Sequence, residues 1–185
     1  MPSFTKSAIK VSFIKLLNKK PLNKITVKEI VEDCGINRNS FYYHFNDVPS
    51  LIEEIFIEEA EKLVQNRSDD GSLYESLIAA IDFALKNRTA VLHIYNSANR
   101  EIFERYLNRV SYSAVSGFIN TVETAADINE DDREAIVMYY KCQLVGFVID
   151  WLGSGMKYDL CIKLKRICEL FDGSMETAIE RCSKK

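Results

Sequence analysis

The chain has 185 residues, of which 47% are hydrophobic and 28% charged, and its formal net charge is -3. This globular balance excludes a wholly disordered chain, and the length allows one domain or two small ones. The charge is uneven, because residues 1–48 carry 8 Lys and Arg against 4 Asp and Glu, a balance of +4, while the rest carries 16 against 23, a balance of -7.

The charge asymmetry and the placement of proline both bear on the class of protein. A small basic part joined to a larger acidic part can mark a nucleic-acid contact surface, and chance clustering of surface charge explains it equally well. All 3 Pro lie within the first 49 residues. A chain free of proline after that point favours long helices over a sandwich or barrel, so we expect an all-α protein.

Residues 5–19 are predicted to form an amphipathic helix that ends before Pro21. Its apolar positions recur at the spacing of one helix face, and they are Ile9, Phe13, Leu16 and Leu17. Its lysines are expected mostly off that apolar face, and they are Lys6, Lys10 and Lys15.

A helix-turn-helix is predicted next along the chain. Thr26 and Glu29 form a capping box, in which each side chain accepts a hydrogen bond from the backbone amide of the other, so a helix starts here. Gly35 supplies the backbone conformation of a tight helix exit. Asn37 then caps a second helix over residues 38–45, and two short helices joined by a glycine turn are the layout of this motif.

The second of these helices has one apolar and one polar face. Phe41 and Phe45 are four residues apart and are expected in the core. The outer side chains are polar or aromatic, with no acidic group among them, and they are Arg38, Asn39, Ser40, Tyr42, Tyr43 and His44. Such a face suits a helix lying in the major groove of DNA. The alternatives are that one of the two tyrosines packs against the first helix and that the histidine is structural.

The remaining sequence predicts helices only. A fourth helix over residues 47–66 tolerates Pro49 in its first turn and carries many glutamates, which fits a connector turned away from nucleic acid. A loop is expected at residues 66–71, and Ser72 opens a second capping box. Further helices are expected at residues 72–86, 89–97, 100–125, 131–152 and 159–180, which makes about nine in all.

Several functional classes lack their sequence motifs. No hydrolase nucleophile, phosphate loop or dinucleotide fingerprint is found, so we expect no enzyme, no catalytic residue and no cofactor. With 5 Cys, no Cys-x-x-Cys pair and 2 His, no metal site is expected and the thiols are expected to be reduced. A redox role for Cys161 or Cys168 is the alternative. The sequence has no signal-peptide pattern, and its apolar stretch at residues 144–152 is too short to cross a bilayer, so the cytoplasm is the expected location.

The stretches Thr26–Ile30 and Gly35–Phe45 closely resemble the DNA-binding domain of TetR/AcrR-family transcriptional regulators, over roughly residues 5–63. The stretch Trp151–Met156 is similar to a pattern in one branch of that family. The resemblance implies a helix-turn-helix DNA-binding domain at residues 1–48 and a helical regulatory and dimerisation domain at residues 49–185.

The resemblance also implies a repressor that is a homodimer joined through its last two helices, with a palindromic operator in double-stranded DNA and an unknown small-molecule effector. The expected DNA contacts are Thr26, Lys28, Arg38, Asn39, Ser40, Tyr42, Tyr43 and His44. The effector pocket is expected to draw on large side chains that can equally be core residues, namely His93, Phe103, Tyr106, Tyr140, Phe147 and Trp151.

One position departs from the family pattern. Val48 stands where the family usually has a lysine that contacts a phosphate, and Asp47 precedes it. Fewer phosphate contacts predict weaker and less salt-dependent DNA binding. The alternative function is therefore a protein-interaction or ligand-sensing co-regulator with a weakened DNA-binding domain.

Overall fold

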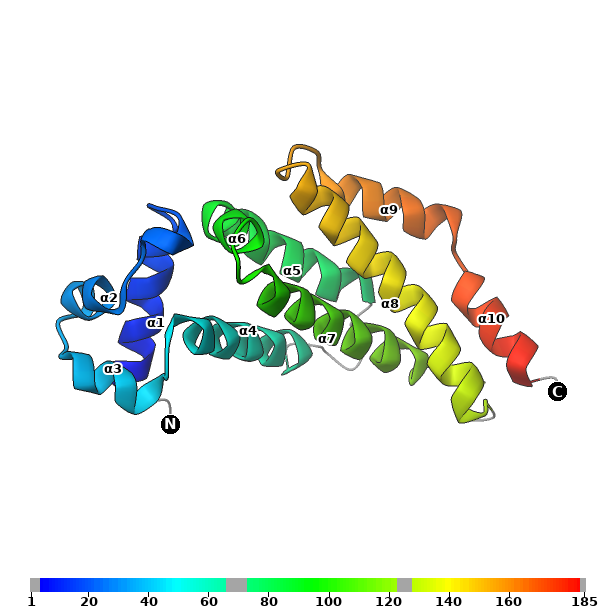
Figure 1. Ribbon diagram of the computed structural model, residues 1–185. Helices are drawn as coiled ribbons and strands as arrows, with labels where there is room; N and C mark the ends of the chain where they lie inside the picture. Colours follow the sequence, from blue (N-terminus) through cyan, green and yellow to red (C-terminus); the bar gives the residue numbers. More distant parts are fainter. Residues whose placement is uncertain (1–3, 66–72, 123–127, 184–185) are drawn as a thin grey trace. The chain divides into compact units, whose positions relative to one another are not determined.

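The computed structural model describes residues 4–65, 73–122 and 128–183, and within these ranges the chain is helical with no strand (Figure 1). This confirms the predicted all-α class. The described ranges contain ten α-helices and one short 3-10 helix. In chain order they are α1 (Phe4–Leu17), η1 (Leu22–Lys24), α2 (Val27–Cys34), α3 (Arg38–His44), α4 (Val48–Gln65), α5 (Leu73–Lys86), α6 (Arg88–Tyr95), α7 (Arg100–Ile119), α8 (Glu130–Gly153), α9 (Leu160–Leu170) and α10 (Ser174–Ser183).

These helices belong to two compact units. The head unit comprises Met1–Lys62 and Phe83–Tyr106, and the body unit comprises Leu63–Asp82 and Leu107–Lys185. The head unit therefore holds α6 as well as α1 to α3 and most of α4. The boundary between a DNA-binding domain and a regulatory domain, expected between residues 48 and 49, stays a prediction.

The head unit is built around the predicted helix-turn-helix. The Thr26 hydroxyl accepts a hydrogen bond from the Glu29 amide at 3.3 Å, and the Glu29 carboxylate accepts one from the Thr26 amide at 3.0 Å, so the capping box is confirmed. Gly35 ends α2 with a φ of 70°, in the left-handed region that favours glycine. Side chains of α1, α2 and α3 meet in the core, where Ile9, Ile30 and Phe41 are fully buried.

One expectation for α1 is wrong at a single lysine. Lys10 is only 8% exposed and lies among the buried positions of the helix, although it was expected off the apolar face. The reason is tertiary, because carboxylates of α4 pair with its ammonium group. The apolar positions Ile9, Phe13 and Leu17 are buried as predicted.

The C-terminal half departs from the predicted helix bounds in two places. The helix expected at residues 159–180 is two helices, α9 and α10, because Gly173 adopts a φ of 70° between them. Helix α7 ends at Ile119, and the Thr121 amide closes a turn onto the Phe118 carbonyl at 2.9 Å. The predicted loop at residues 66–71 and the capping box at Ser72 lie outside the described residues.

The body unit has its own apolar core between α7, α8 and α10. Its members are buried side chains from the three helices, namely Val115, Ile119, Ile136, Val137, Met175 and Ile179. The Tyr140 hydroxyl and the Ser174 hydroxyl lie 3.0 Å apart beside this core and join α8 to the first turn of α10. Burial of this apolar surface stabilises the unit at about 25 cal/mol per Å² removed from water.

Helix α8 depends on its cap. The Asn129 side chain accepts a hydrogen bond from the Asp132 amide at 2.9 Å, which satisfies one of the free amide groups at the start of the helix. Asn129→Ala is expected to lower the free energy of unfolding by about 1 kcal/mol, which corresponds to a Tm lower by roughly 2–4 °C in thermal denaturation. Asn129→Ser is the control, because serine is an equally good cap. Equal Tm values for the alanine and serine variants would contradict this role.

Candidate nucleic-acid interface

Helix α3 separates its apolar and polar side chains as the sequence predicts. Phe41 is fully buried and Phe45 is 4% exposed, whereas Tyr42 is 47% and Tyr43 85% exposed. The ring of Tyr42 stands edge-on to Phe41, with centroids 5.5 Å apart, and the ring of Tyr43 stands edge-on to half-buried His44 at 4.9 Å. Both tyrosines are therefore exposed on the outer surface of the head unit.

The first turn of α3 is fixed by a local cap. The Asn37 side-chain oxygen accepts hydrogen bonds from the Ser40 amide at 2.8 Å and the Ser40 hydroxyl at 3.1 Å. Arg38 and Asn39 are exposed beside this cap, and the Arg38 guanidinium lies 5.8 Å from the centroid of the Tyr42 ring. A rigid turn that presents an arginine and an asparagine offers the two side-chain types that best read guanine and adenine edges.

Two further expected contacts lie at the start of α2. The Thr26 hydroxyl also donates to the Glu29 carboxylate at 3.1 Å, so this group already serves the helix cap. Lys28 is strongly exposed, with its ammonium 3.8 Å from the Glu32 carboxylate, a spacing that water screens. Lys28 can therefore reach a phosphate, whereas the hydroxyl groups of Thr26 and Ser40 are both engaged in helix caps.

The positive charge of the head unit is largely paired. Five lysines lie within ion-pair distance of carboxylates of the same unit, in the pairs Lys6–Glu54, Lys10–Glu58, Lys15–Asp33, Lys20–Glu29 and Lys28–Glu32. Among the other basic side chains of residues 4–48, Lys19, Lys24 and Arg38 make no ion pair. The sequence predicts that the glutamate-rich helix α4 is turned away from nucleic acid. It does not predict that glutamates of α4 form ion pairs with lysines of α1. The spacing i, i+4 of like charges on both helices is the signal that could have revealed it.

The segment between α3 and α4 is organised by Asp47. Its carboxylate accepts a hydrogen bond from the Ser50 amide at 2.7 Å, and its own amide donates to the Ser50 hydroxyl at 3.1 Å. Asp47 thus caps α4, where a negative charge suits the helix dipole. Val48 is half-buried as the first residue of α4. The reduced affinity expected from valine at this position stays a prediction.

Three paired carboxyl groups make the stability of the head unit depend on pH. Hydrogen bonds from lysine ammonium groups lower the pKa of Glu29, Asp33 and Glu54, with Lys20, Lys15 and Lys6 as the main donors. A carboxyl group with a lowered folded pKa stabilises the protein above its ordinary pKa, and this contribution is lost as the pH falls through the folded value.

We therefore expect the Tm to fall as the pH decreases below about 4.5, the ordinary range of a glutamate carboxyl. Glu54→Gln is expected to be less stable than the natural protein at pH 7, because it lacks the charged partner of Lys6. The two Tm curves should converge in acid, where the natural carboxyl group is protonated. Thermal denaturation between pH 7 and about 3 measures this, and parallel curves would contradict the lowered pKa.

The six residues expected to line an effector pocket divide between the two units. In the head unit, His93 Nδ1 lies 2.8 Å from the Leu17 carbonyl oxygen, and Phe103 and Tyr106 pack in an aromatic cluster with Phe56. In the body unit, the Tyr140 hydroxyl is engaged by Ser174 and Phe147 is half-buried. Trp151 is 2% exposed, and its indole N–H donates to the Tyr158 carbonyl at 2.9 Å. Each side chain has a packing role here, and their effector contacts stay a prediction.

The head unit also contains a small apolar cavity of about 30 Å³. Its lining comes from α1, α4, α6 and the end of α5, and consists of Phe13, Ile14, Leu17, Ile52, Ile55, Phe56, Phe83, Asn87, Ala90, Val91 and Ile94. None of the six expected pocket residues lines it. Ligand pockets measure roughly 300–1,000 Å³, so this cavity has no room for an effector without movement of its walls.

The alternative redox role concerns Cys161 and Cys168. Partial burial, helped by the carboxylates of Asp159 and Asp172, raises the pKa of Cys161 and of Cys168 respectively. A raised pKa lowers the thiolate fraction, which argues against the alternative redox role. No group of three or more His, Cys, Asp or Glu among the described residues could hold a metal ion.

Two family models match the sequence and together span most of this architecture. Residues 14–55 match the model described as bacterial regulatory proteins of the tetR family. Residues 71–173, more than half of the chain, match a TetR-type model described as a transcriptional regulator C-terminal region. The first match covers the helix-turn-helix and its flanks.

Single proteins agree with these models. The chain is 32% identical over 77 residues to an uncharacterized HTH-type transcriptional regulator, YxbF of Bacillus subtilis (strain 168), and the match spans 42% of this chain but only 20% of that protein. Among solved structures, the dihydroxyacetone kinase operon activator DhaS is similar with a TM-score of 0.78 at 18% identity, over 94% of this chain and 97% of the other. NalD, the secondary repressor of the MexAB-OprM multidrug efflux pump in Pseudomonas aeruginosa, is similar with a TM-score of 0.61 at 17% identity, over 94% and 95%. At these identities the structures show the shared fold alone.

Proposed function

Because the chain belongs to the TetR family of bacterial transcriptional regulators, we propose that it is a homodimer that represses transcription by binding a palindromic operator and that a small molecule releases it. The outer face of α3 carries this proposal, because Arg38, Asn39 and Tyr43 are exposed on a helix whose other face is locked in the core by Phe41. Such a helix can enter a major groove and read base edges. The protein acts by binding rather than catalysis, in the cytoplasm where its DNA lies.

Dimerisation is supported by the apolar surface of the last long helices. Helix α8 is long and apolar enough to cross a membrane by length and composition alone, a test that helices of soluble proteins also pass. Its Tyr139, like Ile162 and Phe171 of the α9 region, is more than half exposed in the single chain. A Cβ added at Gly146 of α8 would meet open space, which leaves room for a second helix to approach closely. We propose that a second copy covers this surface with its own α8 and α9.

Release by an effector is proposed to act through the separation of the two recognition helices. Half-sites of an operator repeat at about 34–36 Å, one turn of DNA. An effector that prefers a conformation with another spacing of the two α3 helices therefore prevents simultaneous contact with both half-sites. Two of the expected pocket residues, Trp151 and Tyr106, are packed against other side chains or backbone in this conformation.

The deciding experiment is selection of bound duplexes from a random DNA pool at a stated salt concentration, followed by sedimentation of the complex. We expect a palindrome with two half-sites and one dimer per duplex. A reporter gene placed behind the selected operator then gives the sign of regulation, which matters because DhaS and NalD are named as an activator and a repressor. A pool that is not enriched for any sequence would contradict the proposal.

A second candidate is a co-regulator that binds a protein or a ligand and has little affinity for DNA. The pairing of four lysines of the head unit with carboxylates favours it, because paired ammonium groups attract phosphates less; they are Lys6, Lys10, Lys15 and Lys20. Absence of enrichment at low salt, together with a partner protein recovered from the same cells, would support this candidate.

A further inference from the structure

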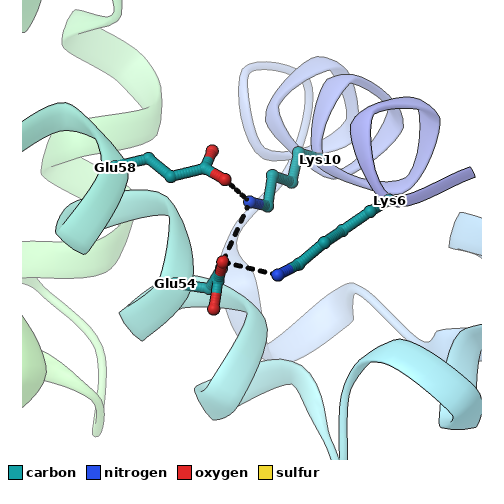
Figure 2. Close-up of polar contacts among 4 residues, drawn as sticks. All are labelled: Lys6, Lys10, Glu54 and Glu58. Atoms are coloured by element: carbon teal, nitrogen blue, oxygen red, sulfur yellow. Dashed lines mark hydrogen bonds and ion pairs between the residues drawn. The ribbon is translucent and has the colours of Figure 1, made fainter. Parts of the chain in front are cut away.

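Four charged side chains join α1 to α4 within the head unit (Figure 2). We call Lys6, Lys10, Glu54 and Glu58 the α1–α4 charge cluster. Lys6 Nζ lies 2.6 Å and Lys10 Nζ 3.5 Å from the same carboxylate oxygen, Oε1 of Glu54, and Lys10 also donates to Glu58. The lysines are four residues apart on α1 and the glutamates four apart on α4, so the two helices pair at successive turns.

The cluster is shielded from solvent at its centre. The Lys10 side chain is 10% exposed, and the glutamates are about one-third exposed at 34% and 35%. An ammonium group so deeply placed is costly unless it is paired, so the two carboxylates account for the position of Lys10 inside the head unit.

Lys6 extends the cluster to the recognition helix. Its ammonium group lies 5.8 Å from the centroid of the Phe45 ring, and Phe45 is the residue that ends α3. The cluster therefore connects three elements, the first helix, the end of α3 and the helix that follows.

We propose that Lys6 and Lys10 are positioning residues for DNA recognition, which fix α3 and α4 by ion pairs within the protein and make no contact with phosphates. This inference rests on the proposed DNA-binding function. A count of charges alone would treat both lysines as phosphate contacts, and the inference assigns them to ion pairs within the protein instead. A phosphate contact requires a positive charge on α1. An internal pair requires only opposite signs on α1 and α4, and this difference separates the two roles.

Exchange of the two charges tests the proposal. Lys10→Glu places three carboxylates together and is expected to lower the affinity for the selected operator at least tenfold. The double variant Lys10→Glu/Glu58→Lys restores opposite signs with the same net charge, and is expected to bind within about threefold of the natural protein. A double variant that binds as weakly as Lys10→Glu, or a single variant that binds normally, would overturn the proposal.

The slope of log affinity against log salt concentration gives a second readout that a structural role alone does not move. Lys10→Gln and Lys28→Gln each remove one positive charge from the head unit, from a buried and an exposed site respectively. This slope is negative, and loss of a phosphate contact makes it shallower by about 1 for each contact. Loss of an ion pair within the protein leaves the slope unchanged. We expect the slope of Lys10→Gln to equal that of the natural protein, and a slope reduced by about 1 or more would overturn the proposal.

Thermal denaturation separates failure of this inference from failure of the DNA-binding function. The Tm is measured for Lys10→Gln, Glu58→Gln and the double glutamine variant. This measurement needs no DNA and can be made on variants of low stability. We expect the double variant to lose less than the sum of the two single losses, each of several degrees. Additive losses would show that the two side chains are not paired, whatever the protein binds.

Discussion

Arg38→Ala is expected to lower the affinity for the selected operator by at least about 30-fold, because each dimer would lose two base contacts worth roughly 1–3 kcal/mol each. Arg38 is exposed on the first turn of α3, and its nearest described aromatic partner is Tyr42, at 5.8 Å. The Tm should change little, since an exposed cation–aromatic contact contributes only about 0.5–1 kcal/mol. Affinity measured by fluorescence anisotropy and Tm measured on the same preparations check both statements.

The matched control is Arg105→Ala. Arg105 is also exposed and lies on α7, where it pairs with Glu101 of the same helix at 3.4 Å and with Glu53 of α4 at 3.8 Å. Both ion pairs are more than half exposed, so water screens them and neither holds α4 in place. Its loss should leave operator affinity unchanged. Arg38→Ala should also relax the preference for one base pair in each half-site, since an arginine that reads a base edge carries sequence information and a phosphate contact does not. Unchanged affinity and unchanged sequence preference in Arg38→Ala would contradict the assignment of α3 as the reading helix.

Phe41→Ala is expected to lower the free energy of unfolding of the head unit by about 3–5 kcal/mol, since the variant loses a buried ring and leaves a cavity. Phe41 is fully buried, and its ring contacts those of Tyr42 and Phe45 with centroids 5.5 and 5.7 Å apart. A domain is stable by only about 5–15 kcal/mol, so the loss is a large share of the total. Operator binding should disappear at temperatures where the natural protein still binds.

Tyr43→Ala separates folding from recognition on the same helix. Tyr43 is 85% exposed, two residues from Phe41, and its removal should change the free energy of unfolding by no more than about 0.5 kcal/mol. Operator affinity should nevertheless fall, because the ring lies on the proposed DNA-facing surface. Urea denaturation of the two variants side by side gives the comparison. Similar stability losses in both would mean that α3 is not divided into a core face and an outer face.

Local patterns gave the correct fold of the helix-turn-helix, because each feature depends on near neighbours. The capping box at Thr26, the left-handed Gly35 and the cap at Asn37 all form hydrogen bonds or turns within four residues, so the sequence alone predicts them. The alternation of Phe41 with exposed neighbours follows from helical periodicity in the same way. The break before α10 was missed, since Gly173 inside an apolar pattern does not by itself end a helix.

The sequence did not show which charged side chains are paired within the protein. A count of side chains gives residues 1–48 a balance of +4, but it does not say which ammonium groups face solvent. Only the packing of α4 against α1 decides that Lys6 and Lys10 face Glu54 and Glu58, residues more than forty positions away. The sequence by itself therefore determined the helices, their caps and the outer face of α3, which depend on local hydrogen bonds and periodicity. The tertiary structure decided which charges are available to a partner, because ion pairs between helices depend on distances that no local pattern contains.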